Sequence, residues 1–324
     1  MFESLTGKGL LIHHWDTDGI CSARLILEKL KDKDITNKTP QLGNYYLTEE
    51  ELENYSKYDY IIIADMSLPE DNILRLAKHA KVMIFDHHLG KVMEQVFHNN
   101  PVIKDESPEK YPSASWIVND FLGNPVNLHG LLGIIGDHEQ KIKNNQEFFK
   151  KITDYCNENS LTFDDLLKMA YLLDSNYKLG DKEAVEEAPR LLIDNITADY
   201  ILKNKKWNDN FNKLNQELER QLNMPHDEID GIILKKINTS YNIISQLTRK
   251  VAWTSEKNTV VINTGFFEDR DQIYVRGKKN AEPLITRGKS LGFKCGGKKE
   301  VFGGIVPKEQ TDSFLKEILE FLKM

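Results

Sequence analysis

The chain has 324 residues, of which 40% are hydrophobic, 9% aromatic and 29% charged, a composition that excludes a disordered or collagen-like protein. Its 43 basic and 50 acidic residues leave a net charge of −7, so the whole surface is not built to wrap long nucleic acid. The longest apolar runs are about strand length, far short of the roughly 20 residues that span a bilayer. We therefore expect no membrane partner, and the length favours two domains.

The N-terminus and the cysteines indicate the compartment. Met1–Lys8 lacks a basic flank and a long apolar region, so no secretory signal is expected. Cys21, Cys156 and Cys295 are odd in number, widely spaced and form no CxxC pair, which favours a reducing interior over a disulfide framework. The sequence predicts a cytoplasmic protein.

Residues 1–90 repeat one unit: a short apolar run, a polar turn and then an amphipathic stretch. The runs Leu10–His13, Tyr60–Ala64 and Val82–Phe85 have the length and composition of buried strands. Ile20–Leu30 and Leu68–Ala80 have helical periodicity. Strands that alternate with helices, and that are apolar along their length, predict a parallel α/β sheet covered on both faces.

The middle of the chain loses these strand signals. Ser113 is expected to cap a helix that runs to Leu122, and Leu161–Leu173 has helical spacing. Asn195–Leu222 is polar and charged, with apolar residues at intervals of three and four. We expect this last segment to be a connecting helix.

Strand-like runs return beyond Asn223. They are Ile229–Ile237, Thr259–Asn263 and Gln272–Val275, and they alternate with the helix-like stretches Ile243–Trp253 and Phe314–Leu322. The predicted fold class is therefore α/β, with a parallel-sheet first domain, a helical connector and a smaller α/β second domain. The expected boundaries are residues 1–194, 195–222 and 223–324.

Metal-ligating side chains follow the first three expected strands directly. After Leu10–His13, three such residues stand at i, i+2 and i+4, so an extended backbone directs them to one side. The carboxyl ends of adjacent parallel strands face one crevice, where open α/β sheets bind ligands. A further acidic residue follows an apolar, helix-like segment at Gly133–Ile135. The candidates are His14, Asp16, Asp18, Asp65, Asp86, His87, His88 and Asp137.

Each of these residues alone has an ordinary explanation, since an aspartate after a strand is more often a helix cap than a ligand. Several carboxylates in one crevice, however, would repel one another and raise their own pKa values unless cations neutralise them. Aspartate and imidazole ligands without thiolates suit Mn²⁺, and Mg²⁺ less well. The number of carboxylates suits two ions, which can share a carboxylate and bind one phosphate.

The order and approximate spacing of four segments resemble the four motifs of the DHH phosphoesterase superfamily. These segments are His14–Gly19, Asp65, Asp86–His88 and Gly136–Asp137. The superfamily includes RecJ-like single-strand exonucleases, nano-RNases, cyclic-dinucleotide phosphodiesterases and manganese-dependent pyrophosphatases. The resemblance extends to about Gln140 and resumes near the C-terminus, and four ordered motifs are far more specific than Asp-His-His alone.

The resemblance implies a role for each candidate. One Mn²⁺ would be held by His14, Asp16 and Asp65. The second ion would be held by Asp18, Asp65, His87 and Asp137, so that Asp65 bridges. Asp86 would orient a histidine, and His88 would contact the scissile phosphate. His13, Trp15 and His138 have no role in this pattern and are expected to be structural.

A basic segment lies near the C-terminus. Asp271–Lys299 holds eight basic and two acidic residues, which marks a focused anion surface in an acidic chain. Its centre, Cys295–Gly304, contains glycine pairs that either admit an anion to the backbone or form hairpin turns. By resemblance to the DHH-associated C-terminal domain, the substrate-binding residues would be Arg276, Gly296, Gly297, Lys298, Gly303 and Gly304.

The segment departs from that pattern at three positions. Lys298 stands where the family usually has histidine, and Val301 and Phe302 replace small residues. Lysine keeps the positive charge but not the imidazole geometry. The departure therefore concerns substrate preference and leaves the metal ligands unaffected.

The resulting expectation is a metal-dependent phosphodiesterase that releases nucleoside monophosphates from short single-stranded oligonucleotides or linear dinucleotides, by attack of a metal-bound hydroxide. One alternative is a RecJ-like exonuclease acting on longer single-stranded DNA or RNA. The other is a non-catalytic partner of replication or DNA repair proteins, which would be marked by missing ligands. A pyrophosphatase is disfavoured by the basic glycine-rich segment.

Overall fold

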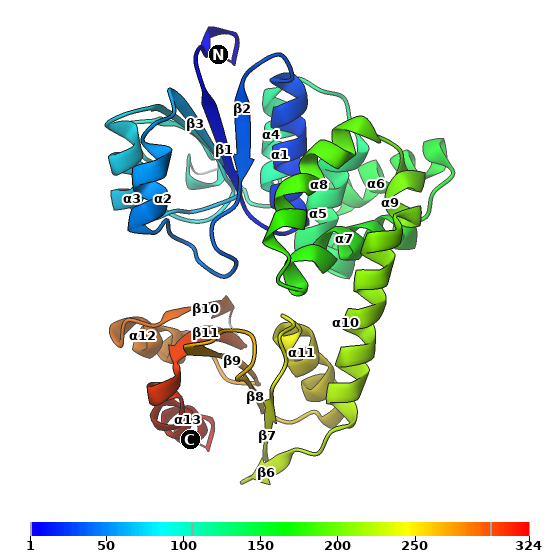
Figure 1. The fold of residues 1–324 in the computed structure, drawn as a ribbon. Helices are drawn as coiled ribbons and strands as arrows, with labels where there is room; N and C mark the ends of the chain where they lie inside the picture. Colours follow the sequence, from blue (N-terminus) through cyan, green and yellow to red (C-terminus); the bar gives the residue numbers. More distant parts are fainter. Residues whose placement is uncertain (1, 105–106, 299, 324) are drawn as a thin grey trace. The chain divides into compact units, whose positions relative to one another are not determined.

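The computed structural model describes residues 2–104, 107–298 and 300–323, with the side chain of Lys298 excluded. The chain forms two compact units (Figure 1). The N-terminal unit comprises residues 1–177 and 181–210, and the C-terminal unit comprises residues 178–180 and 211–324. The expected three-part division at residues 194 and 222 stays a prediction. No helix of the described residues is both long and apolar enough to cross a membrane.

The N-terminal unit is built on the predicted parallel sheet. Its strands are β1 (Gly9–His13), β2 (Ile35–Lys38), β3 (Tyr60–Ala64), β4 (Lys81–Phe85) and β5 (Phe97–Asn99). Their order is β2-β1-β3-β4-β5, and every pairing is parallel. β1 and β3 are buried along their full length, which explains their continuous apolar character. The polar edge strands β2 and β5 escaped sequence reasoning.

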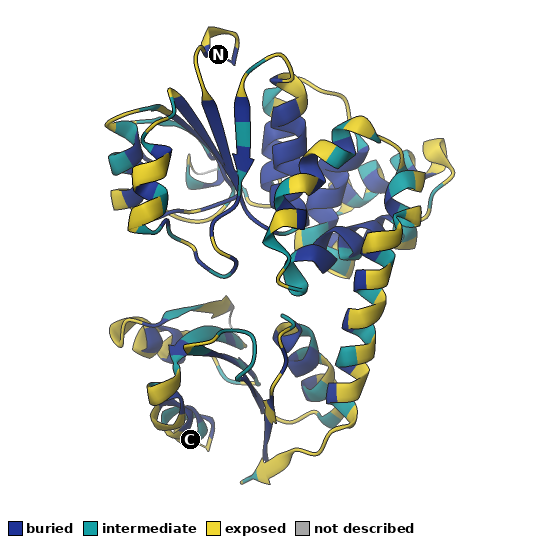
Figure 2. Ribbon diagram, in the orientation of Figure 1, coloured by how far each residue is buried: buried dark blue, intermediate teal, exposed yellow. Residues whose placement is uncertain are grey.

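Helices cover both faces of this sheet, with α2 and α3 on one side and α1, α4 and α5 on the other (Figure 1). The buried surfaces of α1 and of the central strands form the core in Figure 2. The helices of this unit are α1 (Thr17–Lys29), α2 (Glu49–Tyr55), α3 (Glu70–Ala77), α4 (Ala114–Phe121), α5 (Leu128–His138), α6 (Gln146–Asn159), α7 (Phe163–Lys178), α8 (Lys182–Asp194) and α9 (Ala198–Lys203).

The expected connecting helix at 195–222 is divided in two. The structure has α9 and then α10 (Lys205–Asn223), separated at Asn204. The backbone N–H of Trp207 donates to Asn204 Oδ1 at 3.1 Å, so this side chain begins a new helix instead of continuing the old one. The boundary between the two compact units falls within α10.

The C-terminal unit has a second sheet, in the order β10-β11-β9-β8-β7-β6. Val260 and Ile262 of its strand β8 pack in one cluster with Phe314, whereas the intervening Val261 packs with Leu247. This alternation shows that both faces of the sheet are covered by helices. The elements are β6 (Asp227–Ile229), β7 (Ile232–Ile237), α11 (Ile244–Ser255), β8 (Thr259–Asn263), β9 (Arg270–Arg276), α12 (Glu282–Ser290), β10 (Lys294–Lys298), β11 (Val301–Pro307) and α13 (Lys308–Lys323).

Candidate metal centre

The carboxyl ends of β1, β3 and β4 lie next to one another because these strands are neighbours in register. His13 pairs with Ala64, and Ala64 pairs with Phe85. The three motifs that follow these strands therefore emerge at one edge of the sheet, as the sequence indicated.

The loop after β1 turns directly into α1. Asp16 caps this helix, accepting the backbone N–H of Gly19 at 3.1 Å. Thr17 is held from α7, since its backbone N–H and its hydroxyl donate to Asp174 Oδ1 at 2.9 and 2.7 Å. Sequence reasoning missed Asp174, a buried acid whose partner is 157 residues away. In the sequence, the only indication of this role was that Asp174 is a charged residue on an otherwise apolar face of its helix.

Asp18 is completely buried in the first turn of α1. Its two oxygens accept the backbone N–H groups of Ala114 at 2.7 Å and Ser115 at 2.9 Å. These groups form the N-terminal end of α4, where a carboxylate is favoured. A Cβ at Gly133 would lie 2.2 Å from Asp18 Oδ1, so only glycine lets α5 approach this carboxylate.

Asp65 occupies the centre of the arrangement. Its φ is +58°, a left-handed conformation in which aspartate is tolerated better than most residues. Its Oδ2 lies 3.6 Å from His14 Nδ1, and its Oδ1 lies 3.5 Å from His87 Nε2. The two oxygens of one carboxylate thus face two different imidazoles.

Among the described residues, three groups of potential ligands lie around this carboxylate, and the third consists of Asp65, His87 and His88. In the first, the ligand atoms of His14, Asp16 and Asp65 lie within 4.8 Å of one another. The second group, Asp18, His87 and Asp137, satisfies the same limit, and Asp137 Oδ2 is 3.2 Å from His87 Nε2. The structure brings together all six residues that the sequence nominated as ligands. Their division into two ion sites stays a prediction.

Neighbouring carboxylates raise the pKa values of the His14 and His87 imidazoles. Burial disfavours charge on His14, yet the carboxylates of Asp16 and Asp65 outweigh it and raise its pKa well above the usual 6.5. Burial also opposes charge on His87, but Asp65 and Asp137 raise its pKa to about 10. Without cations, both rings therefore hold a proton at neutral pH.

The carboxylates show the complementary effect. Burial, and then repulsion from Asp65, raises the pKa of Asp18 to about 7. Burial and the charge of Asp18 raise the pKa of Asp137 well above 3.8. Burial works against ionisation of Asp65, but the neighbouring imidazoles of His14 and His87 outweigh it and lower its pKa. Protons thus supply the compensation that divalent cations would otherwise provide.

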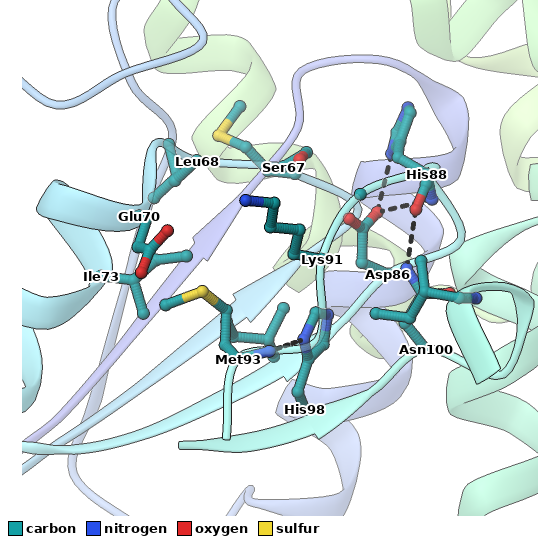
Figure 3. A pocket seen from close by; sticks show the side chains of 14 residues that line it. Ser67, Leu68, Glu70, Ile73, Asp86, His88, Lys91, Met93, His98 and Asn100 are labelled. Atoms are coloured by element: carbon teal, nitrogen blue, oxygen red, sulfur yellow. Dashed lines mark hydrogen bonds and ion pairs between the residues drawn. The ribbon is translucent and has the colours of Figure 1, made fainter. Parts of the chain in front are cut away.

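Asp86 holds His88 in place. Its Oδ1 accepts the backbone N–H of His87 at 2.9 Å. The same oxygen accepts the backbone N–H of His88 at 3.3 Å and lies 2.7 Å from the His88 ring atom Nδ1 (Figure 3). Although burial opposes charge on His88, Asp86 raises its pKa. The ring is still 46% exposed, so the imidazole beside Asp65 is accessible to a substrate.

A cavity of about 200 Å³ adjoins this histidine on the α3 side. Apolar side chains, among them Leu68, Ile73 and Met93, share its lining with Lys91 and His98 (Figure 3). His98 Nδ1 accepts the backbone N–H of Met93 at 3.2 Å, which fixes the ring at the cavity wall.

Three other residues of this region have structural surroundings. His13 is fully buried, its Nδ1 donates to the carbonyl of His14 at 2.6 Å, and burial lowers its pKa to about 4. Trp15 is buried and packs against His14, with the centres of the two rings 4.3 Å apart. His138 Nε2 donates to the Pro112 carbonyl at 2.9 Å.

The glycine-rich segment of the C-terminal unit is a β-hairpin. β10 and β11 pair antiparallel, with Gly296 opposite Gly303. A Cβ at Gly297 would lie 1.8 Å from the Val301 carbonyl oxygen, and added Cβ atoms at Gly303 and Gly304 would lie within 2.8 Å of aromatic rings, whereas Gly296 faces open space. Close packing therefore accounts for three of the four glycines. Their role in binding substrate stays a prediction.

Two basic candidates complete the comparison with the sequence. Arg276 ends β9, and its backbone lies opposite Val301 of the hairpin. Its Nε is buried and makes no hydrogen bond within the described part of the chain. The backbone of Lys298 ends β10, but its side chain lies outside the described residues.

The contact between Asp86 and His88 predicts that Asp86 acts on turnover through His88 and not through metal binding. We expect Asp86→Asn to lower turnover by about 10–100-fold, because losing the carboxylate lowers the pKa of His88 and removes its positive charge. The loss should be greater at about pH 8 than at about pH 6, while Mn²⁺ affinity stays nearly unchanged.

Rate–pH profiles and calorimetric Mn²⁺ titrations check this, with His88→Ala as the control. That variant should lose turnover without the added pH dependence, and Asp86→Asn should cost little more in its background. A large loss of metal affinity in Asp86→Asn would instead place Asp86 in support of the ligands.

Comparison with known families gives one match. Residues 9–156 match the N-terminal domain of the DHH family. Among curated proteins, no match was found.

Several solved structures share the fold at low sequence identity. RecJ from Thermus thermophilus, solved with Mn²⁺, has a TM-score of 0.71 and 16% identity, over 98% of this chain and 52% of that one. A pGpG-specific phosphodiesterase, PggH, from Vibrio cholerae has a TM-score of 0.52 and 14% identity, over 97% and 98% of the chains. CDC45 from Entamoeba histolytica has a TM-score of 0.54 and 10% identity, over 96% and 94%. This chain thus spans about half the length of the Thermus RecJ.

Proposed function

We propose that this chain is a member of the DHH superfamily and a metal-dependent phosphodiesterase that hydrolyses short single-stranded oligonucleotides or linear dinucleotides to nucleoside monophosphates. One observation carries the proposal: Asp65 presents one oxygen to each of two ligand groups. A carboxylate shared in this way suits a pair of divalent cations.

The donor set fits such cations. His14 Nε2 is buried and makes no hydrogen bond among the described residues, and the cluster offers aspartate and imidazole without thiolate. These ligands suit Mn²⁺, with Mg²⁺ as a weaker substitute. His14, Asp16 and Asp65 would hold one ion, and Asp18, Asp65, His87 and Asp137 the other. Bound there, the pair would activate water and neutralise a phosphodiester.

The remaining side chains would handle the substrate. His88, kept charged and oriented by Asp86, would stabilise negative charge on the phosphate oxygens. In the C-terminal unit, Arg276 has a buried Nε that makes no hydrogen bond among the described residues, and its backbone lies opposite Val301 of the β10–β11 hairpin. Arg276 and Lys298 would bind phosphate. A site with so few basic groups suits a short substrate.

A RecJ-like activity on longer single-stranded DNA or RNA is the second candidate. It is favoured by the structural similarity to the Thermus RecJ. A non-catalytic role with replication or repair proteins would rest on the similarity to CDC45. The complete set of six ligands favours catalysis instead.

The free cysteines Cys21, Cys156 and Cys295 accord with the expected cytoplasmic location, which remains part of the proposal. The proposed binding partner is the substrate, a short single-stranded nucleic acid or a dinucleotide.

Substrate length tests the proposal. With Mn²⁺, catalytic efficiency should be highest on di- to tetranucleotides, because a few basic side chains cannot follow a long backbone. End-labelled DNA and RNA oligomers of about 2 to about 20 nucleotides, a range beyond one domain's usual footprint, provide the series. Efficiency that keeps rising with length would support the RecJ-like alternative. No hydrolysis of any oligomer would support the non-catalytic one.

A further inference from the structure

The C-terminal unit exposes one tryptophan beside two arginines. Trp253, in the last turn of α11, is 64% exposed, whereas Trp15 and Trp207 are almost wholly buried. The guanidinium carbons of Arg249 and Arg276 each lie 5.6 Å from the centre of the Trp253 ring. An indole of this exposure leaves a large apolar surface in water, which stability does not require.

The two arginines come from different elements of the fold. Arg249 precedes Trp253 by one helical turn on α11, so their proximity follows from helix geometry. Arg276 comes from a different element, the end of β9, where its backbone lies opposite Thr259 and Val301. The fold therefore brings a second guanidinium to this ring. That guanidinium carries a buried Nε without a hydrogen bond among the described residues.

We propose that Trp253 and Arg276 form a nucleotide-binding site for single-stranded nucleic acid, in which a base stacks on the indole and the neighbouring phosphate pairs with the guanidinium. We call this pair the Trp253 platform. It goes beyond the metal centre and rests on the proposed function for its substrate class. Exposed aromatic rings beside cationic groups bind single strands in this manner, because every base offers a flat face and every linkage a negative charge.

Charge favours this occupant over a protein. The segment Asp271–Lys299 has eight basic and two acidic residues in a chain of net charge −7. Lys278, two residues beyond Arg276, is exposed. An anionic strand would gain from Arg276 beside the ring and from Lys278, while one of its bases covers the apolar indole. The platform therefore predicts that binding needs both the base and the phosphate.

Tryptophan fluorescence of the full chain can test this without catalysis. The protein is titrated in chelator with a trinucleotide, (dA)3, and with a matched trimer of abasic sugar phosphates. Stacking should quench Trp253 with (dA)3 and leave it bright with the abasic trimer. Trp253→Ala should remove the quenching and weaken binding of a labelled trimer by about 5- to 150-fold. Trp253→Phe, which keeps a ring, should restore part of that affinity.

Trp116→Phe is the control variant, because Trp116 lies in α4 of the N-terminal unit against Phe148 and its loss should leave the quenching intact. Equal quenching by the abasic trimer, or undiminished binding by Trp253→Ala, would overturn the platform. Quenching that grows with protein concentration alone, and disappears in Trp253→Ala, would show that the ring contacts another protein and would overturn it too.

The result is separable from the proposed function. Quenching in chelator together with no hydrolysis in Mn²⁺ would keep the platform and refute the phosphodiesterase. Hydrolysis in Mn²⁺ without quenching would keep the phosphodiesterase and refute the platform.

Discussion

Replacing Asp65 by asparagine is expected to lower the hydrolysis rate by at least about a thousandfold, on the scale of losing a central catalytic group. The reason is geometric: one carboxylate faces both His14 and His87, so the substitution weakens both ion sites at once. Asparagine is a better probe than alanine here, because the backbone at this position has a φ of +58° and asparagine tolerates that conformation. The fold should therefore survive.

The measurement compares steady-state hydrolysis with Mn²⁺ in the wild type, Asp65→Asn and the control Asp71→Asn. Asp71 is an exposed acid in the first turn of α3, and its substitution should leave the rate unchanged. Circular dichroism confirms that each variant is folded. Near-normal turnover in folded Asp65→Asn would refute a shared carboxylate.

Metal affinity is expected to rise steeply with pH. In the cation-free protein Asp18 has a pKa raised to about 7, and His87 a pKa raised to about 10, so both hold protons that a metal ion must displace. Affinity should therefore increase by about tenfold per pH unit for each proton displaced. Calorimetry in two buffers of different ionisation enthalpy would count those protons. Affinity that is independent of pH would contradict the proton-filled cluster.

The same shifts fix the sign of the stability change. A raised pKa in the folded state favours folding below the unfolded-state pKa, and this contribution is lost as pH rises through the folded-state value. For Asp18 that window runs from about 4 to 7, and for His87 from 6.5 to about 10. Asp65, whose pKa is lowered, acts in the opposite direction and only under acidic conditions.

Thermal unfolding from about pH 5.5 to about pH 8.5 checks the sign. The chelated protein should lose stability as pH rises, while the Mn²⁺-loaded protein should not. The difference in melting temperature should thus widen with pH. A difference in melting temperature that narrows as pH rises would contradict the predicted sign.

The sequence predicted the first sheet well, because buried parallel strands are continuously apolar and β1, β3 and β4 are read directly from that pattern. The same pattern indicated where the candidate residues would gather, because His14, Asp65 and Asp86 stand immediately after such strands. Local signals and tertiary arrangement agree at these positions.

Features that depend on distant contacts were out of reach. The bond from Thr17 to Asp174 joins residues far apart in the chain, and no periodicity reveals it. The hairpin of β10 and β11 contains four glycines, which are disfavoured in strands, so no strand was predicted there. The pairing of Trp253 with Arg276 joins a helix to a strand end, and the sequence alone gave no reason to single out that tryptophan.

The central claim is that Asp65 is shared by two ions, and electron paramagnetic resonance of the Mn²⁺-loaded protein tests it most directly. Together with a calorimetric count of bound metal, it should show two Mn²⁺ per chain with the spectrum of an exchange-coupled pair, since a carboxylate bridge brings the ions within about 4 Å. Asp65→Asn should lose the coupled signal. A single bound ion, or two ions with uncoupled spectra in the wild type, would contradict the shared site.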